Sequence, residues 1–167
     1  REGRWLVGYG MAGVSYPYYQ VPCQARASLC RDGSAYVRSA ATDIGTGTYT
    51  VMTQLAAELL GLEVSRVRFD LGDSDMPYSP QAGGSGLTGA LANAVHTACH
   101  NLVKEFLDVV RDDEASPLRG AAPGDVTVSG GRLHRISAPD QGEAYTDILA
   151  RHGVEELSAD GRSTPPD

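Results

Sequence analysis

Two short segments rich in glycine and threonine carry the residues of this sequence that are best suited to bind a ligand. The first, Asp43–Thr50, has the sequence Asp-Ile-Gly-Thr-Gly-Thr-Tyr-Thr, and the second, Gln81–Thr88, has the sequence Gln-Ala-Gly-Gly-Ser-Gly-Leu-Thr. Glycine lets backbone N–H groups approach a ligand, and the first N–H groups of a helix lack intrahelical acceptors. Because a helix start also carries the positive end of the helix dipole, each segment could cradle an anion. Together the two segments favour one ligand with phosphate-like groups held between them.

Helix capping is the alternative interpretation of both segments. Thr46 or Thr48 could cap a helix after the first segment, and Ser85 could cap a helix in the second. For the first segment taken alone, capping is favoured. In the second, three glycines in four residues exceed what capping requires and cost backbone entropy. Close approach of a ligand or of another backbone segment explains these glycines better.

A literal dinucleotide-binding motif, Gly-x-Gly-x-x-Gly, occurs at residues 8–13 after an apolar segment. This motif functions only where its last glycine opens a helix that faces a pyrophosphate. The residues that follow include Pro17 and Pro22 and cannot form that helix. We therefore interpret the match as accidental.

Other groups of reactive side chains are weaker candidates. His96, Cys99 and His100 have a spacing that resembles metal ligation, but the sequence is not HExxH, and ordinary side chains beside an apolar helix face are favoured. The Gln141-Gly142-Glu143 segment (141–143) has no base or nucleophile placed beside it. We assign no catalytic and no metal-ligating residue in this chain.

The bulk properties limit the class of protein. With 167 residues, 41% of them hydrophobic, the chain can form one domain with a packed core. The net charge of −7 argues against nucleic-acid binding, so an anionic ligand would have to be held by neutral donors. The sequence lacks an apolar run long enough to span a membrane and lacks a signal-peptide pattern. It starts at Arg1, which we interpret as a cut from a longer protein.

Both segments lie between elements with clear periodicity. Period-two patterns predict strands at 5–11, 25–29, 35–41 and 67–71 and a hairpin at 126–136; helical spacing predicts helices from Thr48 to Gly61, over 87–110 and at 145–152. This mixture predicts an α+β fold in two layers, with helices packed on one face of a mixed β-sheet. We expect the domain to cover residues 1–157 and residues 158–167 to form a flexible tail.

Several segments resemble the molybdenum-binding (large) subunit of the xanthine dehydrogenase and aldehyde oxidoreductase family. The resemblance covers nearly the whole chain, and it is carried by residues 5–12, 43–50, 60–67, 72–74, 83–95 and 145–151. It implies that the chain is part of the family's molybdopterin-binding region. The combination of the two glycine segments is its most specific feature.

The resemblance implies an oxidoreductase that inserts a water-derived oxygen at a C–H carbon of an aldehyde or of an N-heterocycle such as a purine. It also implies a molybdopterin cofactor carrying molybdenum, in bacteria usually extended to molybdopterin cytosine dinucleotide. Electrons would leave through [2Fe-2S] clusters to a flavin (FAD) or another acceptor, on partner subunits or domains. The cofactor-binding residues implied by the family are Gly45, Thr46, Gly47, Thr48, Gly83, Gly84, Ser85 and Thr88. Many relatives have glutamine where this chain has Thr46.

The chain departs from the family in one important respect. The family's catalytic glutamate belongs to a Gly-x-Gly-Glu motif near the end of the full subunit, and Glu143 lacks the first glycine of that motif. We therefore expect part of a cofactor site and no activity from this fragment alone. The rival hypothesis is a non-catalytic interaction or structural domain whose glycine loops serve only packing and capping. The compartment of the parent protein is left open, with the cytoplasm favoured over export.

Overall fold

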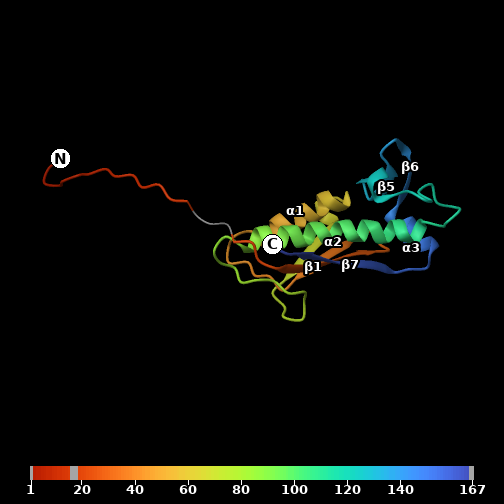
Figure 1. Cartoon of the computed structure of the whole chain (residues 1–167), viewed down its shortest axis with the longest axis horizontal. Coiled ribbons are helices and arrows are strands. Elements are labelled where there is room, and N and C mark those ends of the chain that lie inside the picture. Colours follow the sequence, from red (N-terminus) through yellow and green to blue (C-terminus); the bar gives the residue numbers. More distant parts are fainter. Residues whose placement is uncertain (1, 16–18, 166–167) are drawn as a thin grey trace.

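The computed structural model describes residues 2–15 and 19–165 and shows two β-sheets with helices around them (Figure 1). The strands are β1 (Cys23–Cys30), β2 (Ala35–Ser39), β3 (Val67–Leu71), β4 (Val126–Ser129), β5 (Arg132–Arg135), β6 (Ala138–Ala144) and β7 (Glu156–Ser163). The α-helices are α1 (Thr48–Leu60), α2 (Leu87–Val110) and α3 (Tyr145–Arg151), and short 3-10 helices occupy Val64–Arg66 and Pro123–Asp125. No helix of the described residues is long and apolar enough to cross a lipid bilayer.

The larger sheet has the strand order β3-β2-β1-β7. Strand β1 is antiparallel to both β2 and β7, whereas β2 and β3 are parallel, so the sheet is mixed. Helices α1 and α2 pack on the same face of this sheet (Figure 1). The predicted α+β fold, a mixed sheet with helices on one face, is confirmed.

Helix α2 provides the largest share of the core. The apolar side chains at helical spacing that predicted this helix are all buried, namely Leu87, Leu91, Val95, Ala98, Leu102, Phe106 and Val110. They meet the inward-facing side chains of β1, including Ala25, Ala27 and Leu29, which are fully buried as well. Because α2 packs against the sheet along its length, its N-terminus has a fixed position there.

Small residues bring α2 unusually close to β7. A Cβ atom added to Gly161 would lie 2.2 Å from the backbone nitrogen of Ala98 and 2.3 Å from the carbonyl oxygen of Ala94. Only glycine fits between a strand and a helix at this distance. The glycine in β7 is thus a requirement of the helix–sheet contact.

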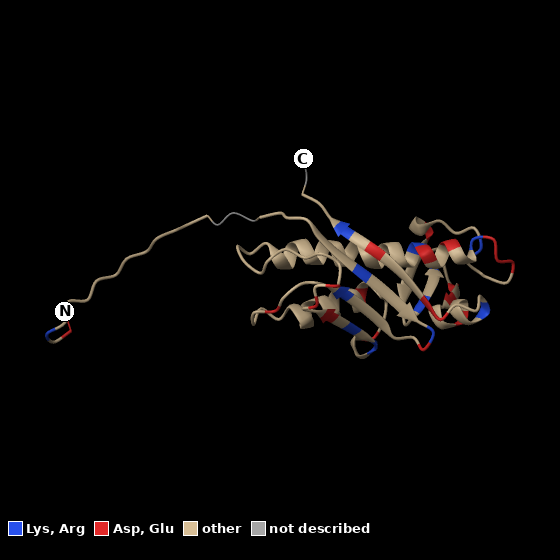
Figure 2. Ribbon diagram, turned by 90° about the horizontal axis from the view of Figure 1, so that it is seen from below, with Lys and Arg blue, Asp and Glu red and all other residues tan. Residues whose placement is uncertain are grey.

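The opposite face of the larger sheet is polar. Arg26 of β1 makes a bidentate ion pair with Asp160 of β7, with N–O distances of 2.7 and 2.8 Å. On the same face the hydroxyl oxygens of Ser28 and Ser158 lie 2.8 Å apart. Figure 2 shows charged residues of both signs along these strands. The sheet is therefore apolar toward the helices and polar on its other side.

The prediction of a strand at residues 5–11 is wrong. This segment is extended but unpaired, apart from an isolated bridge between Glu2 and Trp5, and Tyr9 and Met11 are almost fully exposed. It projects away from the body of the chain (Figure 1). Its alternation of apolar residues identifies a segment that could form a β-strand, but a strand also requires a neighbouring sheet edge with which to pair. Part of the loop expected before Cys23, residues 16–18, lies outside the described residues.

The prediction of a flexible tail is also wrong for residues 158–163, which belong to strand β7. Strand β7 pairs with β1 along its whole length, from Glu156 opposite Cys30 to Ser163 opposite Cys23. Its inward-facing residues are Leu157 and the small Ala159, Gly161 and Ser163, so its sequence has too little hydrophobic signal to predict a strand. Residues 166 and 167 lie outside the described part of the chain.

A smaller antiparallel sheet, β4-β5-β6, lies at the C-terminal end of α2. The predicted hairpin is confirmed as β4 and β5, but the third strand was not expected. The Tyr145 hydroxyl, at the start of α3, donates to the carbonyl oxygen of Leu60 at 3.1 Å. Gly61 ends α1 with a φ of 62°, as its position in the sequence predicted.

Charged side chains join α3 to the smaller sheet and to the end of α2. The buried Glu143 carboxylate accepts hydrogen bonds from Ser116 and from the Arg151 guanidinium. Arg151 also donates to Asp113 at 2.7 Å, and His152 lies 3.0 Å from the same carboxylate. The backbone N–H of Ala115 and the side chain of Arg151 lower the pKa of Asp113 to about 2.

Replacing Gly161 with alanine should destabilise the fold, because the added methyl group would collide with the backbone of α2. We expect a loss of at least about 2 kcal/mol, which is typical of overpacking against a rigid neighbour. Urea denaturation followed by circular dichroism measures it. Gly124→Ala is the control, since a Cβ there meets open space, and equal stability of the two variants would contradict the packing argument.

Because the pKa of Asp113 is lowered in the folded state, its charged form stabilises the fold at neutral pH. That contribution is complete above the unfolded-state pKa of about 3.9 and disappears as the pH falls toward 2. We expect Asp113→Asn to be less stable than the wild type at pH 7 and to approach it under acid conditions. Urea denaturation at several pH values measures the difference, and a gap that stays constant down to pH 2 would contradict the prediction.

Candidate functional site

The two glycine segments meet at one cavity between the beginnings of α1 and α2. The cavity has a volume of about 270 Å³. It is lined by Ile44, Thr46, Ala82, Gly83, Gly84, Ser85, Leu87 and Thr88. The expectation that both segments face a shared space is therefore met by the geometry.

The first segment is organised around its own carboxylate, Asp43. Oδ1 of Asp43 accepts hydrogen bonds from the N–H groups of Gly45 (2.9 Å), Thr46 (2.9 Å) and Gly47 (3.2 Å). Oδ2 accepts another from Tyr49 in the first turn of α1, at 3.3 Å. Desolvation acts to raise the pKa of Asp43, but the four N–H donors outweigh it and the pKa is lowered. The main-chain donors of this segment thus serve an anion that belongs to the chain itself.

The glycines of the first segment are required by backbone conformation. Gly45 and Gly47 have φ values of 98° and 78°, in the left-handed region that other residues rarely adopt. A Cβ at either position would meet no atom within 4 Å. These two glycines therefore turn the loop around Asp43 and are not there to admit a neighbouring backbone.

The threonines of the first segment differ in exposure. Thr46 is exposed and lines the cavity, whereas Thr48 is buried and does not line it. Their hydroxyl oxygens lie 3.1 Å apart. Neither side chain caps α1, whose N-cap residue is Gly47, so the capping prediction for Thr46 or Thr48 is wrong. Asp43 caps α1 instead, because its Oδ2 atom accepts the N–H of Tyr49 in the first turn of the helix.

The second segment presents its donors to solvent. Gly83, Gly84 and Ser85 are exposed, and the N–H groups of Gly84 and Ser85 donate to no acceptor in the described part of the chain. Ser85 does not cap α2, which corrects the second capping prediction. It has a φ of 56°, which is uncommon for a residue other than glycine and is strained.

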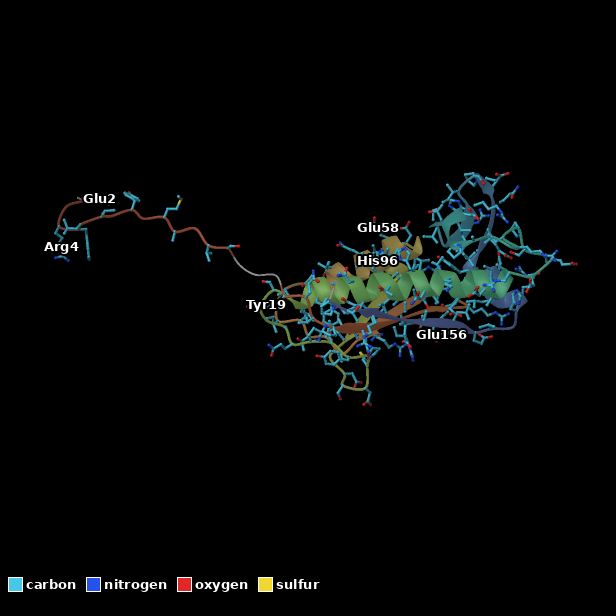
Figure 3. All side chains as sticks on the ribbon, viewed as in Figure 1. Glu2, Arg4, Tyr19, Glu58, His96 and Glu156 are labelled. Carbon is cyan, nitrogen blue, oxygen red and sulfur yellow. The ribbon has the colours of Figure 1, made fainter. Side chains whose placement is uncertain are left out.

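The turn into α2 is closed by residues that precede β1. A Cβ at Gly86 would lie 3.0 Å from the carbonyl oxygen of Tyr19 and 3.7 Å from the Val21 side chain. Figure 3 shows Tyr19 at the end of the molecule where α2 begins. Gly86 is therefore a packing glycine, whereas a Cβ at the exposed Gly83 would have only the Gln81 side chain within 4 Å, at 3.9 Å.

The structure thus brings together five of the eight sequence-predicted site residues: Thr46, Gly83, Gly84, Ser85 and Thr88. Gly45, Gly47 and Thr48 shape the first loop but do not line the cavity. Sequence reasoning did not identify Asp43, Ile44 or Leu87. An aspartate two residues before a glycine is a known turn signal, because its carboxylate accepts nearby backbone N–H groups.

The other reactive side chains considered in the sequence, on α2 and at Glu143, are engaged in packing or in internal hydrogen bonds. Cys99 is fully buried in the core, and the Nδ1 atom of His100 lies 2.9 Å from the carbonyl oxygen of His96. In the described part of the chain, no three His, Cys, Asp or Glu side chains are placed to hold a metal ion. Glu143 is engaged by Arg151 and Ser116, as described above.

A larger open cavity of about 710 Å³ lies beside β1, β7 and the middle of α2. Its charged groups include Arg26 and Asp160, which neutralise each other, and Asn101 donates to the Asp160 carbonyl at 2.8 Å. None of the sequence-predicted site residues lines it. The cavity between the two glycine segments is therefore the better candidate site.

Comparison with known proteins identifies the family. Residues 1–166 match the sequence profile of the molybdopterin cofactor-binding domain. The chain therefore belongs to the molybdopterin cofactor-binding domain family.

Individual relatives agree with this assignment. The chain is 39% identical over 113 residues to the aldehyde oxidoreductase molybdenum-binding subunit of Escherichia coli K12, covering 68% of this chain and 15% of the relative. It is 35% identical over 114 residues to the xanthine dehydrogenase molybdenum-binding subunit of Escherichia coli O157:H7, covering 64% and 15%. The chain thus spans about a seventh of the length of these relatives.

Solved structures share the fold. Quinoline 2-oxidoreductase from Pseudomonas putida 86 superposes with a TM-score of 0.73 at 20% identity, over 87% of this chain and 19% of that one. CO dehydrogenase from Oligotropha carboxidovorans superposes with a TM-score of 0.70 at 18% identity, over 89% and 19%. At this level of identity the likeness establishes the α+β fold.

Replacing Ser85 with glycine should relieve the strain of its left-handed backbone and stabilise the fold by up to about 1 kcal/mol. Chemical denaturation of the variant and the wild type measures the change. Ser74→Gly is the matched control, because Ser74 is also an exposed loop serine but has no positive φ. A Ser85→Gly protein that loses as much stability as Ser74→Gly would show that the residue is not strained.

Proposed function

We propose that this chain is the part of a molybdenum hydroxylase subunit in which two loops hold the phosphate-bearing portion of molybdopterin cytosine dinucleotide. The observation that carries the proposal is the shared cavity between α1 and α2, with exposed N–H groups of Gly84 and Ser85 on one wall. The N-terminal end of α2 adds a favourable dipole at the same wall. Family membership supports molybdopterin as the cofactor, and its cytosine dinucleotide form is part of the proposal.

The residues of the cavity suit a portion of such a cofactor. Its volume of about 270 Å³ lies just below the range of about 300–1,000 Å³ for whole ligand sites, so it would take only part of a dinucleotide. The hydroxyl groups of Thr46, Ser85 and Thr88 add polar partners, and Ile44 and Leu87 add apolar surface. Among the residues that the structure describes, no Lys or Arg lines it, so a phosphate would be held by neutral donors.

The work of this chain is therefore binding and orientation. Gly84 and Ser85 offer main-chain donors at fixed positions, because α2 is anchored along its length by the core. Thr46 faces them across the cavity and limits the orientations of a bound group. The cofactor, when bound, supplies the redox-active molybdenum.

The parent protein that we propose oxidises an aldehyde or an N-heterocycle such as a purine. The names of the curated relatives, an aldehyde oxidoreductase and a xanthine dehydrogenase subunit, support this class of reaction. Iron–sulfur and flavin subunits or domains would pass on the electrons. Glu143 would not serve as the catalytic base, because its carboxylate is buried and held by Arg151 and Ser116.

The rival function, a domain whose glycine loops serve only packing, explains Gly86 but not the exposed turn beside it. Packing glycines approach other atoms closely, as Gly86 approaches Tyr19. Gly83 has no protein atom nearer than 3.9 Å to the position of a Cβ. The cavity between the helix starts therefore favours a ligand.

Replacing Gly84 with valine in the complete subunit should prevent cofactor incorporation, because the side chain would fill the wall of the cavity. We expect molybdenum content and released cytidine monophosphate to fall by at least about tenfold, measured by elemental analysis and by chromatography. Gly120→Val is the matched control. It has a similar positive φ, of 67° against 59°, and open space around it, but it does not line the cavity. Normal molybdenum and nucleotide content in a folded Gly84→Val subunit would refute the proposed site.

A further inference from the structure

We propose that Asp43 is a specificity-determining residue, whose carboxylate fills the main-chain anion site of the first loop and so reserves phosphate binding for the second loop. This inference rests on the proposed function, because it concerns how the two walls of the same cavity divide the ligand. It also reverses the simplest interpretation of the sequence, in which both loops bind phosphate.

The geometry of the first loop supports the occupied state. Successive N–H groups of Gly45, Thr46 and Gly47 converge on one oxygen of Asp43, and the N–H of Tyr49 binds the other. Converging N–H groups of this kind form the concave sites that bind anions in proteins. Here the anion is covalently attached two residues before the first donor, so it is present at a very high effective concentration.

Electrostatics then oppose a second anion at the same place. A phosphate approaching Gly45–Gly47 would meet a carboxylate whose charge is already stabilised by the available donors. Like charges a few ångströms apart repel, and this loop has no Lys or Arg side chain to offset the repulsion. What the first loop offers to the cavity is instead the Thr46 hydroxyl and the apolar side chain of Ile44. Such a wall suits a neutral part of a ligand.

The second loop has the opposite character. Residues 81–88 include no acidic side chain, and the N–H groups of Gly84 and Ser85 have no acceptor in the described part of the chain. The two loops look alike in the sequence, each with glycines before a helix, but only one carries its own anion. The presence of Asp43 therefore makes the two walls of the cavity different: the wall on α2 accepts phosphate, and the wall on α1 is neutral.

Nuclear magnetic resonance of the 167-residue chain tests this, with inorganic pyrophosphate as the probe. In the wild type, pyrophosphate should leave the amide signals of Gly45, Gly47 and Tyr49 unmoved, because these residues do not line the cavity. In Asp43→Ala the emptied site should bind pyrophosphate, and the same signals should shift with an affinity at least about tenfold higher than in the wild type. A purely structural role for Asp43 predicts no gain of binding at this loop.

Asp73→Ala is the matched control, because this substitution removes the same charge. Asp73 also accepts a backbone N–H in its own turn, that of Asp75 at 2.9 Å. It should not confer pyrophosphate binding on residues 45–47. Equal gains in Asp73→Ala and Asp43→Ala would overturn the inference, because net charge alone would then explain them. Wild-type signals of Gly45 and Gly47 that shift with pyrophosphate would overturn it as well.

Asp43→Asn keeps an acceptor oxygen in the loop but removes the charge, and it serves if Asp43→Ala does not fold. We expect its response at residues 45–47 to lie between those of the wild type and Asp43→Ala. The absence of any response in a folded Asp43 variant would refute the inference. The proposed function is judged at other signals, those of Gly84 and Ser85. If the signals of Gly84 and Ser85 do not respond to pyrophosphate in the wild type or in any variant, the proposed phosphate-binding wall is wrong. The inference about Asp43 is tested only by the signals of the first loop.

Discussion

The contact between α2 and the larger sheet is the constraint on which the site depends. Helix α2 has 24 residues, so it is about 36 Å long, and its buried face runs from Leu87 to Val110. Where β7 passes beneath it, Gly161 allows the two backbones to approach more closely than any side chain would permit. This contact leaves α2 little freedom to slide or tilt, and so the glycine turn before Leu87 has a fixed position opposite the start of α1.

The site itself follows from the distribution of satisfied and unsatisfied backbone donors. Folding satisfies nearly all buried N–H groups, and donors that remain without partners collect at helix starts. In the first loop Asp43 satisfies them, and in the second loop the N–H groups of Gly84 and Ser85 have no acceptor among the described residues. The left-handed backbone of Ser85 indicates that this open turn is held against a conformational preference. Strain of that kind is characteristic of ligand-binding loops.

Much of the fold could be predicted from the sequence, because its main elements bury one face. The apolar spacing of α2 and the alternation in β1 and β3 reflect burial directly. Prediction failed where the periodicity of apolar residues does not reflect their burial. Strand β7 is ordered by backbone pairing and by α2, although most of its inward side chains are small, and residues 5–11 have a strand pattern without a neighbouring strand. At the site, glycine spacing located both loops, but the hydrogen bonds of Asp43 depend on dihedral angles that composition does not reveal.

An acidic chain that binds a phosphate-bearing cofactor must limit electrostatic repulsion. With a net charge of −7, the protein has little long-range attraction for an anion, and no Lys or Arg of residues 2–15 and 19–165 lines the cavity. Attraction must therefore come from short-range donors whose positions are fixed before binding, which reduces the entropic cost of association. Such donors act only over hydrogen-bonding distances, so they favour a ligand whose shape places its phosphate at one wall. A neutral pocket of this kind has slower association than a basic one, but it discriminates between ligands by their geometry.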